Sequence, residues 1–362
     1  MRIRDRRARR ALIALGALAA GATIGACGGS GGSSPPRPHP KLAMITAAND
    51  QNAFIEMADG AASAAAHLGD AAGLTESAPP SVTDDATTEV QEFQSAETTS
   101  KDGVAVMTTD PPDFAQPEAQ AEAAGIPVVA VDACSLPTAN VPTCVANDNQ
   151  AVGEAIGKKL TAKIPKHSTG TVVVGDDIPQ LQLLGYRITG MEKALKAYDP
   201  HLKFTQEYNV TSDPTTNEQQ WASLVSKYPH AVAYIAPGDQ DAVSFVQIEK
   251  QTHKHYLVIA CDVDPVAIKG VEDGEIYGLG DPEHFLKGYF AIWLLYEHAT
   301  GKSLITGWWN PGDSTITKSN IKAIQKREEN NNTRYAYYKS IIKKETADPQ
   351  KYIKPLSDAG EN

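Results

Sequence analysis

The chain has 362 residues, of which 33 are basic and 44 acidic, and its formal net charge is −11. Such an acidic chain repels nucleic acid and anionic lipid, so we exclude both as partners. Its length is too great for a single small core and suggests two domains.

The first 26 residues predict a signal peptide. Basic MRIRDRRARR precedes the uncharged apolar run 11–26, and Cys27 and a Gly/Ser/Pro-rich segment follow. The residues Ile-Gly-Ala-Cys that end at Cys27 resemble a bacterial lipobox, which implies that Cys27 is lipidated and that residues 27–40 form a flexible linker. We therefore expect an exported protein, lipid-anchored at the outer face of the cell membrane or held in the periplasm.

Two alternatives remain for this N-terminal segment. The apolar run could be a one-span anchor, although it is short and glycine-rich for that role. The pair Arg9-Arg10 is also found in twin-arginine export signals, so Sec and twin-arginine export both stay open. Removal of residues 1–26 takes away six arginines and one aspartate, which leaves 27 basic and 43 acidic residues and a net charge of −16.

After the linker, short apolar runs alternate with helical patterns. Strands are predicted at 41–48, 103–109, 126–132, 170–177, 231–238, 256–264 and 275–281. Helices are predicted at 52–69, 117–125, 148–164, 184–198, 218–229, 241–252, 265–274 and 282–301, of which the last is the longest and most apolar. Nearly continuous apolar strands between helices indicate an α/β fold with parallel sheets covered on both faces.

Polar residues follow these predicted strands. The strand ends hold Asn49, Asp50, Asp110, Asp132, Asp239, Asp262 and Asp281. Ligands of parallel α/β sheets bind at the carboxyl ends of the strands, at a topological switch point. An edge rich in carboxylates suits a ligand that donates hydrogen bonds, which means sugar hydroxyls or a charged amine.

Several segments resemble periplasmic binding proteins of the ribose/galactose type, the solute receptors of sugar ABC importers. The resemblance runs from about Lys41 to Asp313 and rests on Asn-Ala-Phe at 52–54, AGIPVVAVD, VANDNQAVGEAIGKKL, Arg-Ile-Thr-Gly at 187–190 and VIACDVDPVAIKGVEDGEIYG. It implies two doubly wound Rossmann-like lobes with parallel sheets, joined by a three-segment hinge. The corresponding boundaries are 41–146 plus 281–313 for the N-terminal lobe, and 147–280 plus 314–362 for the C-terminal lobe.

The resemblance also implies ligand contacts, at Asn52, Phe54, Asp132, Arg187 and Asp262. Phe54 would stack on the apolar face of a sugar, the aspartates would accept from hydroxyls, and Arg187 would donate to ring or hydroxyl oxygens. Asp239 is a further candidate, or else the cap of the helix that follows it. Each position also has a structural interpretation, because Asp132 could cap a loop, Asn52 a helix, and Phe54 could belong to the core.

The chain departs from the ribose-type pattern at Ala133, Gly238 and Gly280, where arginine, asparagine and glutamine are common. The hydrogen-bonding set is therefore more acidic than ribose requires. With several aspartates facing Arg187, we expect a net negative cleft, which makes charged amines the main alternative to sugars as ligands.

The function implied is a monomeric substrate-binding lipoprotein that delivers its solute to ABC permease subunits. Alternatives are a sensor that docks a chemoreceptor or kinase, and a glycosidase using Asp132 and Asp262, which we disfavour because no nucleophile–base set accompanies them. We expect no enzyme activity, no cofactor and no metal site.

Three cysteines remain besides Cys27. Cys134 and Cys144 lie ten positions apart in a proline-containing loop of an exported chain, which predicts a structural disulfide. A redox pair would normally have the closer Cys-x-x-Cys spacing. Cys261, in an apolar strand next to Asp262, is then a free buried thiol.

Overall fold

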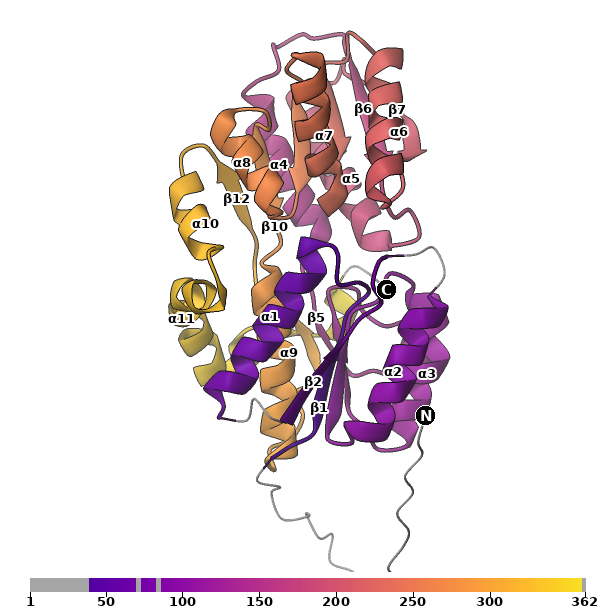
Figure 1. Ribbon diagram of the computed structural model, residues 1–362, viewed down its shortest axis with the longest axis vertical. Helices are drawn as coiled ribbons and strands as arrows, with labels where there is room; N and C mark the ends of the chain where they lie inside the picture. The colour runs from indigo at the N-terminus through magenta and orange to yellow at the C-terminus, as the bar shows by residue number, and fades with distance from the viewer. Residues whose placement is uncertain (1–38, 70–72, 83–85, 360–362) are drawn as a thin grey trace, which may run out of the picture. The chain divides into compact units, whose positions relative to one another are not determined.

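Two mostly parallel sheets organise the computed structural model, which describes residues 39–69, 73–82 and 86–359 (Figure 1). The first sheet has the order β13-β11-β5-β4-β3-β1-β2. Its strands are β1 (Leu42–Ile45), β2 (Leu74–Ser77), β3 (Gly103–Val106), β4 (Val128–Val131), β5 (Thr143–Val145), β11 (Gly307–Trp309) and β13 (Ile353–Lys354). The signal peptide and Cys27 lie outside the described residues.

The second sheet has the order β12-β10-β9-β8-β6-β7. Its strands are β6 (Thr171–Asp176), β7 (Lys203–Asn209), β8 (Ala233–Ala236), β9 (Val258–Cys261), β10 (Gly278–Asp281) and β12 (Ser314–Thr317). Only the pairs β10–β12 and β11–β13 are antiparallel among the described strands. In each sheet the strand order reverses once, between β1 and β3 and between β6 and β8, so each lobe has the predicted doubly wound topology.

Helices cover both faces of these sheets. Those near the first sheet are α1 (Asn52–His67), α2 (Thr87–Thr99), α3 (Pro111–Ala123), α9 (His284–Ala299) and α11 (Asn331–Ala347). Those near the second are α4 (Asn149–Thr161), α5 (Gln182–Tyr198), α6 (Pro214–Lys227), α7 (Asp239–Thr252), α8 (Pro265–Asp273) and α10 (Ile321–Arg327). Short 3₁₀ turns lie at Pro137–Ala139, Pro349–Lys351 and Leu356–Asp358. Figure 1 shows α1 beside α9, and α2 beside α3.

Close helix packing sets the position of α9. A side chain at Gly288 would collide with the backbone carbonyl of Met57 on α1, so the two helices approach closely only because this residue is glycine. No helix in the described ranges is long and apolar enough to cross a membrane. The long apolar pattern of α9 reflects burial, because it packs on β1, β3, β4 and β5 of the first sheet.

The chain passes between the lobes in the three predicted hinge segments and once more near the C-terminus. The first three crossings follow β5, β10 and β11. A further crossing separates α10, which contacts α8 and β12, from α11, which contacts α1 and α9. We predicted that residues 314–362 belong to the C-terminal lobe. For β13 and α11 this is wrong, because β13 pairs with β11 in the first sheet and α11 packs on that lobe.

The predicted elements occur with shifted ends, and some elements were missed. Helix α3 begins at Pro111, six residues before the predicted start, because Asp110 accepts from the Asp113 amide and caps a helix whose first two residues are prolines. The strands β2 and β7 and the helix α2 were not predicted. The two strands expose polar residues along their length, so they lack the apolar run of a central strand. The helix α2 is largely polar, so it gives only a weak apolar pattern.

The disulfide between Cys134 and Cys144 is confirmed, and Cys261 is a free buried cysteine. Cys144 lies in β5, directly opposite Ala130 of β4. The Asp132 amide also donates to the Val145 carbonyl at 2.9 Å. The disulfide therefore fixes the loop that follows Asp132 to the neighbouring strand.

Candidate ligand-binding site

Asp132 and Asp262 occupy matching positions in the two lobes. Asp132 directly follows β4 and Asp262 directly follows β9, and their φ angles are 66° and 68°. Aspartate tolerates this left-handed conformation better than most residues, at a cost that proteins accept mainly at functional sites. Both side chains are buried. The same backbone geometry thus presents one carboxylate from each sheet.

A histidine connects these two carboxylates across the lobes. His284, the first residue of α9, lies with Nε2 at 2.8 Å from Asp262 Oδ1, and its Nδ1 is 3.4 Å from the Lys287 Nζ. Lys287 in turn forms an ion pair with Asp132. The tautomer that satisfies both neighbours donates from Nε2 and accepts at Nδ1. A continuous chain of polar contacts therefore joins Asp132 of one lobe to Asp262 of the other.

Arg187, on α5, completes this charged group. Its Nη1 is 3.2 Å from Asp262 Oδ2 and 3.2 Å from the Pro237 carbonyl, and its Nε donates to Asn149 Oδ1 at 3.0 Å. The guanidinium is fully buried, with an exposed fraction of 1%. Since every contact is to an acceptor of the same lobe, Arg187 also holds the Asp262 carboxylate in place.

These contacts hold both carboxyls in the ionised state. Burial raises the pKa of Asp132, but the charges of Lys287 and Arg187 outweigh it and lower the pKa to about 2. Burial likewise opposes ionisation of Asp262, yet Arg187 and His284 hold its pKa below the usual range. Burial lowers the pKa of Lys287.

Lys287 and His284 were not predicted as site residues, and they correct our expectation that the aspartates face a single arginine. They stand three residues apart on α9, so they share one helical face. Two ionisable residues on the buried face of an otherwise apolar helix were the signal available in the sequence.

Of the other predicted ligand contacts, Phe54 lines the cavity and Asn52 does not. Phe54 lines a cavity together with Asp239 and also belongs to the core of the first lobe. Asn52 joins the lobes, because its amide donates to Asp239 Oδ2 at 2.9 Å and its side chain donates to the Val263 carbonyl at 3.2 Å. Asn52 is not among the cavity residues, whereas the neighbouring Gln51 is.

Asp239 does not cap its helix, because Asp241 fills that role by accepting from the Gly238 amide at 3.1 Å. Asp281, at the end of β10, turns away from the cavity. Its Oδ2 is 2.7 Å from Arg327 Nη1. The strand-end carboxylates therefore do not all serve one site.

The cavity between these groups is small, about 30 Å³. Small-molecule pockets typically measure about 300–1,000 Å³. The space is occupied by Ile178, Leu181, Leu183 and Leu184, which follow β6 and pack in the same core cluster as Phe54 and Met107 of the first lobe. A ligand of monosaccharide size therefore enters only when this apolar segment or the lobes move apart.

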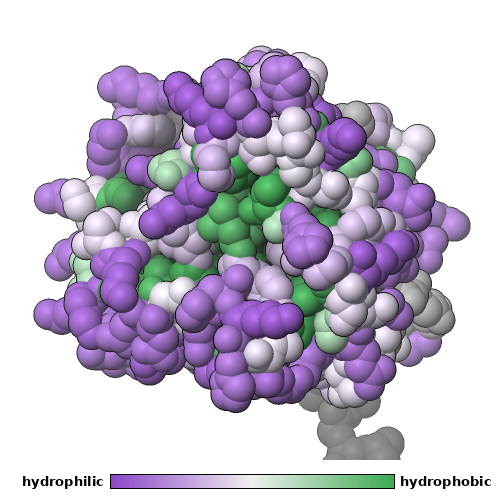
Figure 2. Space-filling view, turned by 90° about the horizontal axis from the view of Figure 1, so that it is seen from above, coloured by the Kyte–Doolittle hydropathy of each residue, from purple (hydrophilic) through white to green (hydrophobic). Residues whose placement is uncertain are grey.

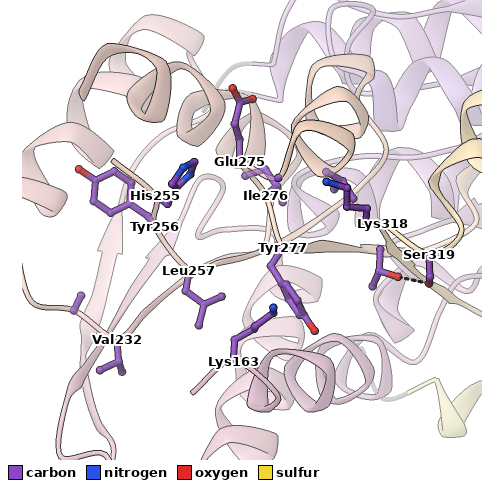
Figure 3. A pocket seen from close by; sticks show the side chains of 14 residues that line it. Lys163, Val232, His255, Tyr256, Leu257, Glu275, Ile276, Tyr277, Lys318 and Ser319 are labelled. Atoms are coloured by element: carbon purple, nitrogen blue, oxygen red, sulfur yellow. Dashed lines mark hydrogen bonds between the residues drawn. The ribbon is translucent and has the colours of Figure 1, made fainter. Parts of the chain in front are cut away.

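A larger hollow lies at the opposite end of the second sheet. It measures about 690 Å³ and is lined by residues at the starts of β8, β9 and β10 (Figure 3). Lys163 Nζ lies 5.1 Å from the centre of the Tyr277 ring, and Thr317 and Ser319 are hydrogen-bonded at 2.8 Å. The face in Figure 2 shows hydrophobic side chains in a depression ringed by hydrophilic ones. Since ligands of parallel sheets bind at the carboxyl ends of strands, we place the site in the smaller cavity.

Two doubly wound lobes with strand-end carboxylates facing one another define a two-lobed solute-binding protein. The comparisons agree with this class. The family model for the periplasmic binding protein domain matches residues 42–303, so this chain belongs to the periplasmic binding protein family. A search of curated protein sequences gave no match.

Solved structures share the fold. An ABC transporter solute-binding protein from Agrobacterium vitis, bound with alpha-D-tagatopyranose, has a TM-score of 0.70 and 21% identity over 78% of this chain and 96% of its own. A carbohydrate transporter solute-binding protein from Agrobacterium radiobacter, in complex with D-arabinose, has a TM-score of 0.71 and 20% identity over 80% and 97%. A glucose-galactose binding protein from Geobacillus stearothermophilus has a TM-score of 0.68 and 19% identity over 78% and 99%.

No group of three or more His, Cys, Asp or Glu side chains within the described ranges is arranged to hold a metal ion.

Proposed function

We propose that this protein is the substrate-binding component of an ABC importer, which captures a sugar or sugar derivative between its lobes and delivers it to a membrane permease. The observation that carries the proposal is the matched pair Asp132 and Asp262, one at the cleft end of each sheet, linked through His284. The sugars bound in similar solute-binding proteins support the ligand class.

Capture proceeds without chemistry. Separation of the lobes breaks the bond between His284 and Asp262 and exposes both carboxylates to solvent. A solute whose hydroxyls bridge Asp132 and Asp262 then favours the closed arrangement, because it binds that state more tightly than the open one. The closed lobes form the surface that a permease recognises.

A hydrolytic role fits these carboxyls poorly. A glycosidase needs one protonated carboxyl as its general acid, beside an ionised partner. Here the pKa values of Asp132 and Asp262 are both lowered, so both groups stay ionised. Binding is therefore the role that their charge state suits.

Lipidation of Cys27 belongs to the same proposal. It rests on the lipobox-like sequence, together with the polar segment that follows and gives the folded domain reach from the membrane. The anchor keeps the receptor beside its permease, and in a bacterium with a single membrane it prevents loss of the protein to the medium.

A calorimetric titration of the mature protein with monosaccharides and polyols tests the binding role. We expect at least one compound to bind, and Asp262→Ala to weaken it by a hundredfold or more, because Arg187 and His284 lose their shared partner. The matched control is Asp264→Asn, since Asp264 caps α8 and an asparagine caps equally well. Equal binding by wild type and Asp262→Ala would contradict the proposal.

A further inference from the structure

Two carboxylates stand at the topological switch point of the second sheet. Asp177 directly follows β6, and Asp239 begins α7 three residues after the end of β8. The strand order reverses between these neighbouring strands, since β6 leads to β7 on one side and β8 to β9 on the other. This crevice is where doubly wound sheets bind ligands.

Both carboxylates are buried and incompletely bonded. The exposed fractions are 2% for Asp177 and 7% for Asp239. Neither oxygen of Asp177, nor Oδ1 of Asp239, has a hydrogen-bond partner among the residues that the structure describes. Both residues line the small cavity of the candidate site. Buried polar atoms without partners are rare in folded proteins, and these three border the cavity in which a ligand would lie.

Gly238 makes room for this arrangement. A side chain at that position would collide with the Asp177 carboxylate, so the absence of one lets the carboxylate lie against the turn after β8. The sequence singles out this glycine as a departure from the asparagine common in ribose-type receptors. In the structure, the carboxyl group of Asp177 occupies the adjacent space.

A neighbouring aspartate shows what a purely structural carboxylate looks like here. Asp241 is fully buried, but it accepts from Trp221 Nε1 at 2.7 Å, from Asn217 at 2.9 Å and from the Gly238 amide at 3.1 Å. No such set of donors surrounds Asp177. Both Asp177 oxygens are therefore free to accept hydrogen bonds from a bound donor.

The charge balance points to a cation as that donor. Asp132 and Asp262 have Lys287 and Arg187 as partners, whereas no ion pair is formed by Asp177 or Asp239 among the described residues. Burial, followed by the charges of neighbouring aspartates, raises the pKa of both carboxyls well above the usual range. A bound ammonium would supply the opposite charge and the missing hydrogen bonds together.

We propose that Asp177 and Asp239 form an acidic subsite that binds the protonated amine of the solute. An amino sugar fits best, because its hydroxyls can engage Asp132 and Asp262 while its amine lies at the switch point. Phe54 and Leu184 provide apolar walls for its C–H faces. This inference rests on the proposed function and adds to it the charge of the solute.

Matched pairs of sugars test the subsite in calorimetric titrations of the mature protein. The probes are glucose with glucosamine, galactose with galactosamine, mannose with mannosamine, and the diamine putrescine. We expect an amine to bind more tightly than its neutral counterpart. In Asp177→Asn we expect the dissociation constant of that amine to increase about ten- to hundredfold, because a charge-assisted hydrogen bond is lost, with little change for a neutral sugar.

The stability of the free protein provides a second measurement that needs no ligand. A buried carboxyl group kept without hydrogen-bond partners destabilises the fold, so Asp177→Asn should melt at the same temperature as wild type or a few degrees higher. Asp241→Asn is the matched control and should melt at a lower temperature, because its amide cannot accept all three hydrogen bonds. A clear loss of stability in Asp177→Asn would overturn the subsite.

The binding outcomes separate the two proposals. A neutral sugar that binds as tightly as its amine, or an equal loss of both in Asp177→Asn, would overturn the acidic subsite and leave the sugar-binding role intact. Binding of putrescine without any sugar would support the subsite and contradict the sugar ligand. No binding by any probe would contradict both.

Discussion

At the scale of single residues, the site is governed by which carboxylates have a cation beside them. Asp132 and Asp262 are bonded to basic side chains that come from α9 and α5. Asp177 and Asp239 lie at the same cavity and lack that support. Although all four residues are strand-end aspartates in the sequence, burial in different surroundings gives them opposite pKa shifts and different roles.

The lowered pKa of Asp132 predicts a defined loss of stability in acid. Its pKa is about 2 in the folded protein against 3.8 as the ordinary value, so the ionised carboxyl stabilises the fold above pH 3.8 and ceases to do so as the pH falls toward 2. We expect the difference in unfolding free energy between wild type and Asp132→Asn to shrink by on the order of 2 kcal/mol between pH ~4 and pH ~2. Urea titrations at each pH measure it, and a constant difference across that window would count against the assignment.

At the scale of elements, the loop between β4 and β5 supports Asp132 through a covalent link. The disulfide closes a loop with a sequence separation of 10 between Cys134 and Cys144, both of them buried. Ala133 and Cys134 also border a small hollow that reaches the apolar segment after β6. A fixed conformation of this loop therefore helps to fix the position of the Asp132 carboxylate.

Loss of this disulfide should affect stability more than binding. We expect Cys134→Ser to lower the unfolding free energy by about 2–4 kcal/mol, because the unfolded chain gains conformational freedom. Ligand affinity should fall only modestly, since β4 and β5 still pair. Denaturant unfolding and calorimetry measure the two effects. Cys261→Ser, at the free buried cysteine, is the control for loss of a sulfur alone. Abolished binding in a folded Cys134→Ser protein would contradict the supporting role.

At the scale of the whole chain, the C-terminal segment contacts both lobes beside the hinge. Arg327 of α10 is buried and bonded to Asp281 at 2.7 Å and to the Tyr338 hydroxyl of α11 at 2.7 Å. Arg334 of α11 bonds Asp59 of α1 at 2.6 Å. Figure 1 shows α10 and α11 in yellow along one side of the chain. These ion pairs tie the hinge segment after β10 to the first lobe.

The network around Arg327 predicts a large effect of a single substitution. Removal of one partner leaves Asp281 as an uncompensated buried charge, so Arg327→Met should lower the unfolding free energy by about 3–5 kcal/mol. The matched control is Lys322→Met. Lys322 lies on α10, as Arg327 does, but it is exposed and pairs with Glu272 of α8, so this ion pair should contribute little to stability. Denaturant unfolding measures both variants. Equal small losses in the two would show that the network does not hold the hinge.

Local patterns in the sequence were sufficient for the central architecture. The buried strands β1, β3, β4, β6, β8 and β9 are near-continuous apolar runs. Asp132, Asp177 and Asp262 directly follow β4, β6 and β9 and line the cavity at the cleft edge of the two sheets. The places of Asp132 and Asp262 at strand ends could be predicted because each depends on the apolar run just before it. The disulfide could be predicted from the spacing of two nearby cysteines and the export of the chain.

Only the tertiary structure decided which charges meet. Lys287 pairs with Asp132 across 155 residues, and His284 reaches Asp262 from a helix that begins at the hinge, so neither contact follows from local periodicity. β13 returns to the first sheet through a short antiparallel pairing with β11. β13 is too short to give a recognisable strand pattern in the sequence. The sequence by itself determined that carboxylates line the ends of two parallel sheets. The fold decided which are neutralised by the chain and which remain for a ligand, because burial and distance set the charge of each group.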